Sequence, residues 1–207
     1  MEQAWPSARL VDVATITDTN VGLATAVYSH TVPADPVYDK CTTTTYAAPN
    51  TAKNLVGLIA RVETDSVACN HFTEGSPPSV PAAVNTLTAP ASVTRPAQVI
   101  SDTLTFFDDQ TNFATTFPQA TTPSKGDVTM VRQAVDATTY QTKNRAAFDS
   151  YGRPVTVWDA NDHTTTTAYT MAAGLTVGTT VTNALRPRLI WVAGRVRCSV
   201  DGCDRCR

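Results

Sequence analysis

Short runs of alternating or β-branched residues recur along the chain, and turn-forming residues separate them. Period-two alternation and an excess of Val, Ile, Thr and aromatic residues favour strands, whereas Gly, Pro, Asn and Asp favour turns. Many short strands at regular spacing predict an all-β sandwich, a barrel or a continuous repeat sheet. The best helical candidate, 54–62, is equally readable as a buried strand. The predicted strands are 9–17, 22–29, 41–47, 55–63, 98–107, 127–133, 138–148, 155–158, 164–170 and 175–182.

Two stretches interrupt this pattern. Residues 75–96 contain five prolines, which lack the backbone N–H and fix φ, so we expect a long extended connection with at most one short edge strand. Residues 117–125, with Pro118 and Pro123, predict a second joint of the same kind.

Composition supports the β interpretation. Hydrophobic residues make up 42% of the chain and charged residues only 16%, below the roughly 25% of ordinary soluble domains. About one residue in six is threonine. Threonine is β-branched and carries a hydroxyl, so it suits a strand whose side chains meet water. This composition favours sheets with wet faces over a helical bundle.

The end of the chain has a different chemistry. Threonine is absent after Thr182, and residues 186–207 hold six arginines against two acidic residues, in a chain whose net charge is −2. A repeat sheet has no physical reason to change so abruptly. We therefore expect Asn183 or Ala184 to mark a frameshift or truncation. A short basic end of this kind is more often solvated than bound to phosphate, so no nucleic-acid partner is predicted.

Segment 148–170 is the most informative part of the sequence. It predicts a strand, a tight turn, a second strand, a second tight turn and a third strand. Gly152 supplies the positive φ that a short hairpin needs, and Asp159 suits the second turn because its side chain can bond the local backbone. Tyr169 is expected to lie across a neighbouring strand from an aromatic residue such as Phe148 or Trp158.

This segment resembles the YD repeat of RHS proteins, whose pattern runs tyrosine-aspartate, a turn, glycine-arginine, a short strand, aspartate, a second turn, threonine and tyrosine. Asp162 stands where the family usually has glycine, so the second turn is expected to differ. Weaker echoes lie at 37–46 and 103–108. The residues of the repeat motif are Phe148, Asp149, Gly152, Arg153, Trp158, Asp159, Thr165 and Tyr169.

The resemblance implies a fold of repeated β-hairpins in a spiral RHS/YD-type sheet, which this chain is too short to close. It implies a structural, non-catalytic part of a shell or cell-surface protein that encloses or presents a C-terminal toxin. The implied partners are the remainder of the larger protein or its cargo, with no cofactor, and the isolated chain should self-associate. The sequence contains no run of 18 apolar residues, so no membrane span is predicted. No signal peptide is visible either, so an export signal is expected elsewhere.

Five segments follow from these patterns. They are a β-rich repeat region at 1–74, a proline-rich connection at 75–96, a second β-rich region at 97–147, the YD-type repeat at 148–183 and an Arg/Cys-rich tail at 184–207.

Two other classes of function stay open. A cell-surface module that binds carbohydrate or protein would need an exposed aromatic platform, for which Trp158, Tyr151 and Tyr169 are the candidates. An enzyme would need a converging nucleophile and base, and the sequence offers none. Asp108 and Asp109, as neighbours on a strand, would point to opposite faces and make a poor acid–base pair.

The cysteines allow three sites. Cys41 and Cys69 could form a disulfide in an exported protein, or stay as buried thiols. The tail cluster of Cys198, Cys203 and Cys206 has part of a metal-binding spacing but lacks a fourth ligand, so no metal is predicted there. A weaker metal site would combine Cys69 with the nearby side chains of His71 and Glu74.

Overall fold

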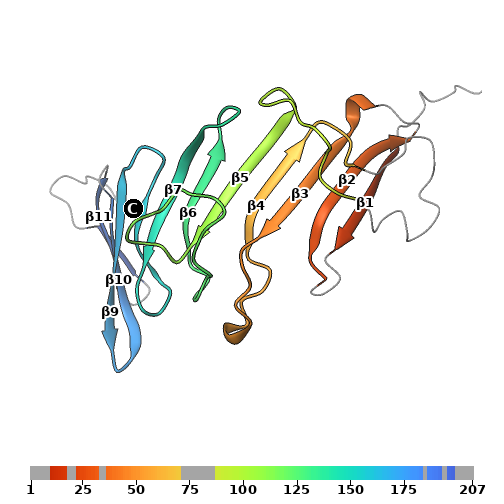
Figure 1. Cartoon of the computed structure of the whole chain (residues 1–207). Coiled ribbons are helices and arrows are strands. Elements are labelled where there is room, and N and C mark those ends of the chain that lie inside the picture. The colour runs from red at the N-terminus through yellow and green to blue at the C-terminus, as the bar shows by residue number, and fades with distance from the viewer. Residues whose placement is uncertain are drawn as a thin grey trace, which may run out of the picture.

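The computed structural model describes residues 10–17, 22–32, 36–70, 87–183, 186–192 and 195–198. Within these ranges the chain forms one antiparallel sheet of twelve strands, and each strand pairs with the next one along the chain. Figure 1 shows the strands side by side in sequence order, with a progressive twist from one side of the sheet to the other. Helix in these ranges is confined to two short 3-10 turns, Pro36–Tyr38 and Thr51–Lys53, so the prediction of an all-β fold is confirmed.

The sheet is open, because β1 and β12 each pair with a single neighbour within the described ranges. The described helices are too short to cross a membrane. The strands are β1 (Leu10–Thr17), β2 (Ala24–Val32), β3 (Lys40–Tyr46), β4 (Ile59–Asp65), β5 (Val99–Phe107), β6 (Val128–Ala134), β7 (Tyr140–Phe148), β8 (Pro154–Trp158), β9 (Thr164–Ala172), β10 (Leu175–Asn183), β11 (Arg186–Val192) and β12 (Arg195–Cys198).

Each of the ten predicted strands overlaps an observed one, and β4 differs most from its prediction. The predicted run began at residue 55, whereas β4 begins at Ile59. Asn54 and Gly57 adopt φ values of 56° and 79°, in the left-handed region that interrupts a strand. These two residues make the end of the connection between β3 and β4 a turn, so the helical interpretation of 54–62 is wrong.

The sheet continues into the atypical tail, where no strand was predicted. β11 pairs with β10 and β12 pairs with β11, both antiparallel. The change of composition after Asn183 is therefore not an end of the sheet within the described ranges. A frameshift or truncation at this point stays a prediction, as do the boundaries of the five sequence segments.

One face of the sheet carries most of the buried apolar side chains, and we call it the covered face. Strand residues alternate between the two faces, and the pairing register carries this alternation from β2 across to β6. The register places the following buried residues on the covered face: Ala26, Tyr28, Cys41, Leu104, Phe106 and Met130.

Long connections between strands supply the layer that covers this face. Cys69 and Leu87, from the connection between β4 and β5, pack with Tyr28 and Cys41. Phe113 and Phe117 belong to the connection between β5 and β6, and they pack against the cluster of Leu104, Phe106 and Met130. A sheet must bury its apolar face against another layer, and here the chain's own connections provide that layer.

The opposite face explains the threonine content. Between β3 and β5 it presents half-buried threonine and valine side chains. Thr42 and Thr64 lie directly across from each other, with their hydroxyl oxygens 3.0 Å apart in a hydrogen bond. Such cross-strand pairs stabilise a sheet by roughly 0.2–1 kcal/mol each. Threonine therefore fills a face that meets water while it keeps strand geometry.

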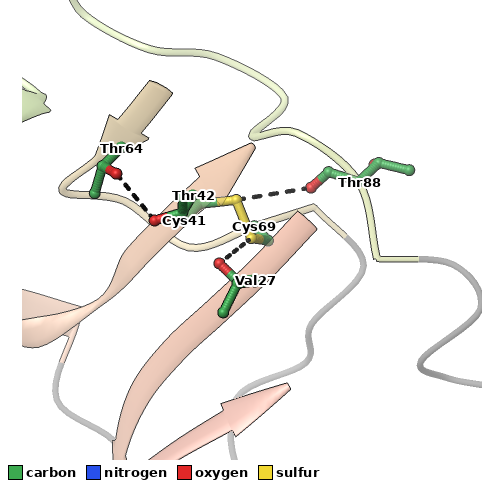
Figure 2. The surroundings of a disulfide bond; sticks show 6 residues. All are labelled: Val27, Cys41, Thr42, Thr64, Cys69 and Thr88. Atoms are coloured by element: carbon green, nitrogen blue, oxygen red, sulfur yellow. Dashed lines mark hydrogen bonds between the residues drawn. A yellow bond between two sulfur atoms is a disulfide. The ribbon is translucent and has the colours of Figure 1, made fainter. Parts of the chain in front are cut away.

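A disulfide joins the sheet to its covering layer. Cys41 in β3 and Cys69 in the connection after β4 are bonded, with an S–S distance of 1.98 Å and Cα atoms 4.9 Å apart (Figure 2). The two sulfurs lie 3.9 Å and 3.7 Å from the carbonyl oxygens of Thr88 and Val27. Disulfide sulfurs carry no proton, so these are packing contacts. They hold both ends of the connection close to β2 and β3.

We expect loss of this bond to weaken the fold substantially. Replacing both cysteines by alanine should lower the free energy of unfolding by about 3–4 kcal/mol, because the bond closes a loop across a sequence separation of 28 residues. Urea unfolding of the oxidised protein and of the Cys41→Ala/Cys69→Ala variant measures the difference. A reductant should weaken the wild type and leave the variant unchanged; equal sensitivity would contradict this assignment.

Candidate functional site

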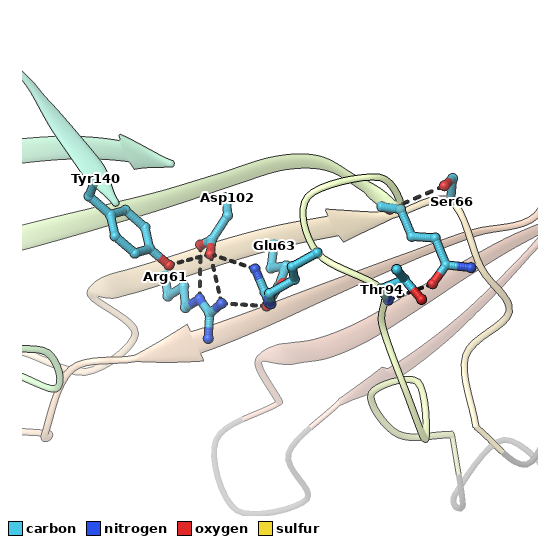
Figure 3. A network of polar contacts seen from close by, with 8 residues as sticks. Arg61, Glu63, Ser66, Thr94, Asp102 and Tyr140 are labelled. Atoms are coloured by element: carbon cyan, nitrogen blue, oxygen red, sulfur yellow. Dashed lines mark hydrogen bonds and ion pairs between the residues drawn. The ribbon is translucent and has the colours of Figure 1, made fainter. Parts of the chain in front are cut away.

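The covered face also holds a cluster of charged residues between β4, β5 and β7. Arg61 and Glu63 occupy alternate positions of β4, and Asp102 lies across from Glu63 in β5. Arg95 comes from the connection that precedes β5, and Tyr140 is the first residue of β7. Figure 3 shows the Tyr140 hydroxyl and the Arg61 guanidinium converging on Asp102.

Asp102 is the centre of this cluster, and its side chain is completely buried. Arg61 donates to both carboxylate oxygens, from Nε at 2.9 Å and from Nη2 at 2.7 Å. The Tyr140 hydroxyl donates to Oδ2, and Arg95 Nη1 lies 3.5 Å from the same oxygen. Glu63 in turn pairs with Arg95, and lies 2.5 Å from Arg61 Nη2. A buried charge is tolerated only when it is paired and hydrogen-bonded in this way.

The electrostatics fix the charge state of the cluster. Burial alone would raise the pKa of Asp102, but the hydrogen bonds from Arg61 and Tyr140 and the two arginine charges bring it below its usual value. Burial, together with the bond to Asp102, raises the pKa of Tyr140. Its bond to Asp102 raises the pKa of Arg61. Arg61 and Tyr140 therefore stay protonated and Asp102 stays ionised. These charge states suit a cluster that holds strands together better than one that transfers protons.

The buried carboxylate of Asp65 is not fully hydrogen-bonded within the part of the chain that the structure describes. Its side chain lies on the covered face beyond Glu63, is 1% exposed, and has one carboxylate oxygen without a hydrogen-bond partner among the described residues. Burial raises its pKa, and the charge of Asp102 raises it further. Three carboxylates therefore face two arginines, and the cost of burying the extra charge falls on Asp65.

The YD-like segment forms two turns of one kind, at 149–153 and 159–163. In the first, the Asp149 carboxylate accepts the backbone N–H groups of Tyr151 at 2.8 Å and Arg153 at 3.0 Å, and pairs with the Arg153 guanidinium at 2.7 Å. The Asp149 N–H donates to the Arg153 carbonyl at 2.9 Å. We call this arrangement an aspartate turn.

The second turn repeats these bonds. The Asp159 carboxylate accepts the N–H groups of Asn161 at 2.8 Å and His163 at 2.9 Å, and contacts the His163 ring at 2.9 Å. Asp162, with φ of 63°, takes the conformation that Gly152 takes with φ of 73°. The expectation that the second turn would differ is therefore wrong, because an aspartate tolerates the left-handed region better than most residues.

The aromatic residues do not form the platform that a carbohydrate-binding site would need. Trp158 pairs with Thr164, and Tyr169 lies an odd number of residues further along β9, so the two side chains point to opposite faces. Trp158 packs edge-on against Phe113. Tyr169 pairs with Thr179 in β10 and lies over the Arg153 guanidinium at 4.3 Å, so its predicted pairing with an aromatic residue is wrong.

Arg153 links the first turn to β9 and β10. Its guanidinium lies between the rings of Tyr151, at 4.9 Å, and Tyr169, and also donates to the Thr176 hydroxyl at 2.8 Å. Thr165 pairs with Val157 across β8 and β9, next to the second turn. The repeat-motif residues thus close two turns and tie β7 to β10, and none of their contacts assembles a reactive group.

The cysteine-based metal candidates of the sequence fall largely outside the described ranges. Residues 71, 74, 203 and 206 lie outside them, as does the side chain of Cys198, and inside them no group of three His, Cys, Asp or Glu side chains is arranged to hold a metal ion. A cavity of about 550 Å³ borders Asp108 and Asp109. Both carboxylates already accept backbone N–H groups, which lower their pKa values despite the opposing effect of burial.

The charged cluster around Asp102 was not found from the sequence. Arg61, Glu63 and Asp65 alternate along a run that otherwise predicts a buried strand, and that alternation of charges is a signal. The partner Asp102 is 41 residues away from Arg61, so no local pattern connects them.

No protein-family model matches the sequence, and a search of curated proteins returns no match.

Asp65 and Asp102 should respond to neutralisation in opposite directions. Asp65→Asn should raise the free energy of unfolding at pH 7 by about 1 kcal/mol, because it removes a poorly satisfied buried charge. Asp102→Asn should lower it by about 3–5 kcal/mol, because Arg61 loses its partner.

The two variants should also differ in how their stability depends on pH. The pKa of Asp65 is raised, so the wild type recovers stability as pH falls through that pKa, and the gain from Asp65→Asn should shrink in acid. The pKa of Asp102 is lowered, so its contribution is present above the ordinary aspartate pKa and lost only in stronger acid. Urea unfolding from pH 4 to pH 8 should show a shrinking gain for Asp65→Asn and a cost for Asp102→Asn that persists across the range; the same sign of change at pH 7 would contradict the assignment.

The two turns should also differ in their tolerance of substitution. Gly152→Val should lower stability by about 1–2 kcal/mol, because valine resists a positive φ. Space is not limiting, since a Cβ there would meet only Asp127 Oδ1 at an ordinary 3.5 Å. Asp162→Gly should not destabilise. Thr156→Val, in an extended position of β8, is the matched control for thermal unfolding; equal effects of the two valine variants would rule out the turn geometry as the cause.

Proposed function

We propose that this chain is a structural, non-catalytic length of an RHS/YD-repeat-type protein, a shell or cell-surface polymer that encloses or presents a C-terminal toxin or effector. The observation that carries the proposal is the pair of aspartate turns at 149–153 and 159–163, joined by β8. Three residue types of the resembling pattern have a role in these turns: the aspartate caps the turn, the glycine or its substitute takes the positive φ, and the arginine of the first turn binds back to the aspartate.

The architecture supports a structural role. Every described strand pairs with its neighbours in sequence order, which is how a sheet grows when hairpins are added one after another. The long connections pack on one face, and the strands at both sides of the sheet keep an unpaired edge within the described ranges. Unpaired edges expose N–H and C=O groups that need another strand, which the remainder of a larger protein would supply.

The disulfide supports an exported protein, either secreted or displayed on the cell surface. Disulfides persist in oxidising compartments and are rare in the cytosol. The Cys41–Cys69 bond lies in the buried core, where it stabilises the covering layer. A binding module for carbohydrate or protein is the other candidate, and the 75% exposure of Tyr151 is its best support. Because Trp158 lies on the opposite face from Tyr169, we favour the structural role.

The proposal predicts that the isolated chain associates through its edges. Thr15 is an exposed residue of the edge strand β1, and a lysine there should hinder pairing with another chain. Sedimentation over a range of concentrations should show association of the wild type and less association of Thr15→Lys. The control Thr111→Lys, at an exposed position in the connection after β5, should associate like the wild type.

A self-sufficient monomer would oppose the proposal. A wild-type chain that stays monomeric at all concentrations and unfolds reversibly in one sharp transition would be a self-sufficient module. Binding of a purified oligosaccharide by such a monomer, lost on Tyr151→Ala, would then favour the carbohydrate-binding alternative.

A further inference from the structure

The end of β5 and the end of β7 share one backbone arrangement. Phe107-Asp108 and Phe148-Asp149 close the two strands, and in each hairpin the register shifts at the phenylalanine. The return strands β6 and β8 both begin two residues after a glycine of positive φ, which is 83° at Gly126 and 73° at Gly152. Both hairpins therefore enter and leave their turns in the same way, although one connection is much longer.

The hydrogen bonds of the two turns correspond as well. The Asp108 N–H donates to the Asp127 carbonyl at 2.9 Å, as the Asp149 N–H donates to the Arg153 carbonyl at 2.9 Å. The Asp108 carboxylate accepts from Lys125 and Asp127, both at 2.9 Å. These two donors occupy the places that Tyr151 and Arg153 occupy around Asp149.

The longer turn closes through the Asp108 side chain. In the short turn Ser150 follows Asp149 directly, whereas in the long one Ser124 donates its N–H to the Asp108 carboxylate at 2.5 Å. Without residues 109–123 the chain would read Asp-Ser-Lys-Gly-Asp, beside Asp-Ser-Tyr-Gly-Arg in the short turn. The aspartate turn is thus complete on both sides of the extra segment.

The extra segment contacts equivalent atoms in both hairpins. Gln119 binds the backbone N–H and carbonyl of Phe107, each at 2.8 Å. Gln110 Oε1 accepts the N–H of Phe148, the equivalent residue of the next hairpin, at 2.7 Å. Phe113 lies against Trp158, with ring centroids 5.5 Å apart.

A charged residue completes the contact with the second hairpin. The Arg145 guanidinium in β7 lies 5.2 Å from the Phe113 ring and 5.4 Å from the Trp158 ring, and its Nη2 is 2.5 Å from Asp162. The contact therefore reaches the second turn at 159–163. In Figure 1 the connection after β5 crosses β6 and β7, in agreement with these contacts.

We infer that residues 109–123 are an insertion into a complete aspartate turn, and that they act as a clamp that fixes the β7–β8 hairpin to the β5–β6 hairpin. The insertion binds the backbone N–H of the phenylalanine in each hairpin, at the position where the ladder register shifts. The inference concerns this chain's own residues and does not rest on the proposed function.

The clamp can be tested at its far end in the full chain. Gln110→Ala/Phe113→Ala should increase the amide hydrogen exchange rate of Phe148 and Asp149 at least tenfold, with less than a twofold change at Phe107 and Asp108. Gln119→Ala should do the reverse, with the increase at Phe107. Gln141→Ala, an exposed position of β7, is the control and should change neither. Equal changes in both hairpins, or none in either, would overturn the clamp.

A second experiment tests the insertion itself without exposing the core. A flexible 15-residue Gly/Ser segment placed between Asp149 and Ser150 should leave exchange of the β7 and β8 amides within about threefold of the wild type, because the Asp149 carboxylate can hold both sides. The same segment between Tyr151 and Gly152 should increase that exchange more than tenfold. If both junctions respond equally, the turn is not built to accept an insertion after its aspartate.

Discussion

The whole structure depends on how a single antiparallel sheet buries one of its faces. A lone sheet has no second layer, so its apolar side chains would stay in water unless the chain itself covers them. Here the connections after β4 and β5 provide that cover, with Cys69 and Leu87 over one cluster and Phe113 and Phe117 over the other. These connections are long because they form the second layer of the fold as well as joining strands.

The charged cluster follows from this constraint. The cover brings Arg95 over the sheet and excludes water from Asp102, so every charge beneath it needs a partner. The cluster also defines the register of β4 against β5. A slip of one residue would turn Arg61 and Glu63 to the opposite face and separate them from Asp102. Apart from Lys40 at the start of β3, the strand residues of that face between β3 and β5 are uncharged; the central ones are Thr42, Thr44, Val62, Thr64, Thr103 and Thr105. Asp65, with its raised pKa, carries the remaining cost of this arrangement.

The sequence predicted what short-range chemistry decides. Alternation and turn residues located ten strands, because side chains of period two and residues such as Gly152 act within a few positions. Their limit is visible at Asn54 and Gly57, where two left-handed residues shorten an apolar run that looked continuous. The partnership of Arg61 with Asp102 lay beyond any local pattern. β11 and β12 were missed because their arginine-rich composition hid strand-forming positions.

The aspartate turns at Asp108 and Asp149 explain how one turn geometry can recur in the structure without a constant sequence spacing. Residues 103–108 gave only a weak echo of the YD pattern, because the glycine that should follow Asp108 closely is Gly126. A carboxylate that accepts several backbone N–H groups can hold a turn without chain continuity, so the motif survives when its spacing does not. A sequence motif with fixed spacing does not detect such a turn, whereas the hydrogen bonds of its aspartate still identify it in the structure. The connection between β3 and β4 enters and leaves its turn in a similar way without an aspartate: Ala47 donates its N–H to the Leu58 carbonyl at 2.8 Å, just after Gly57 of positive φ, and residues 47–58 contain no carboxylate.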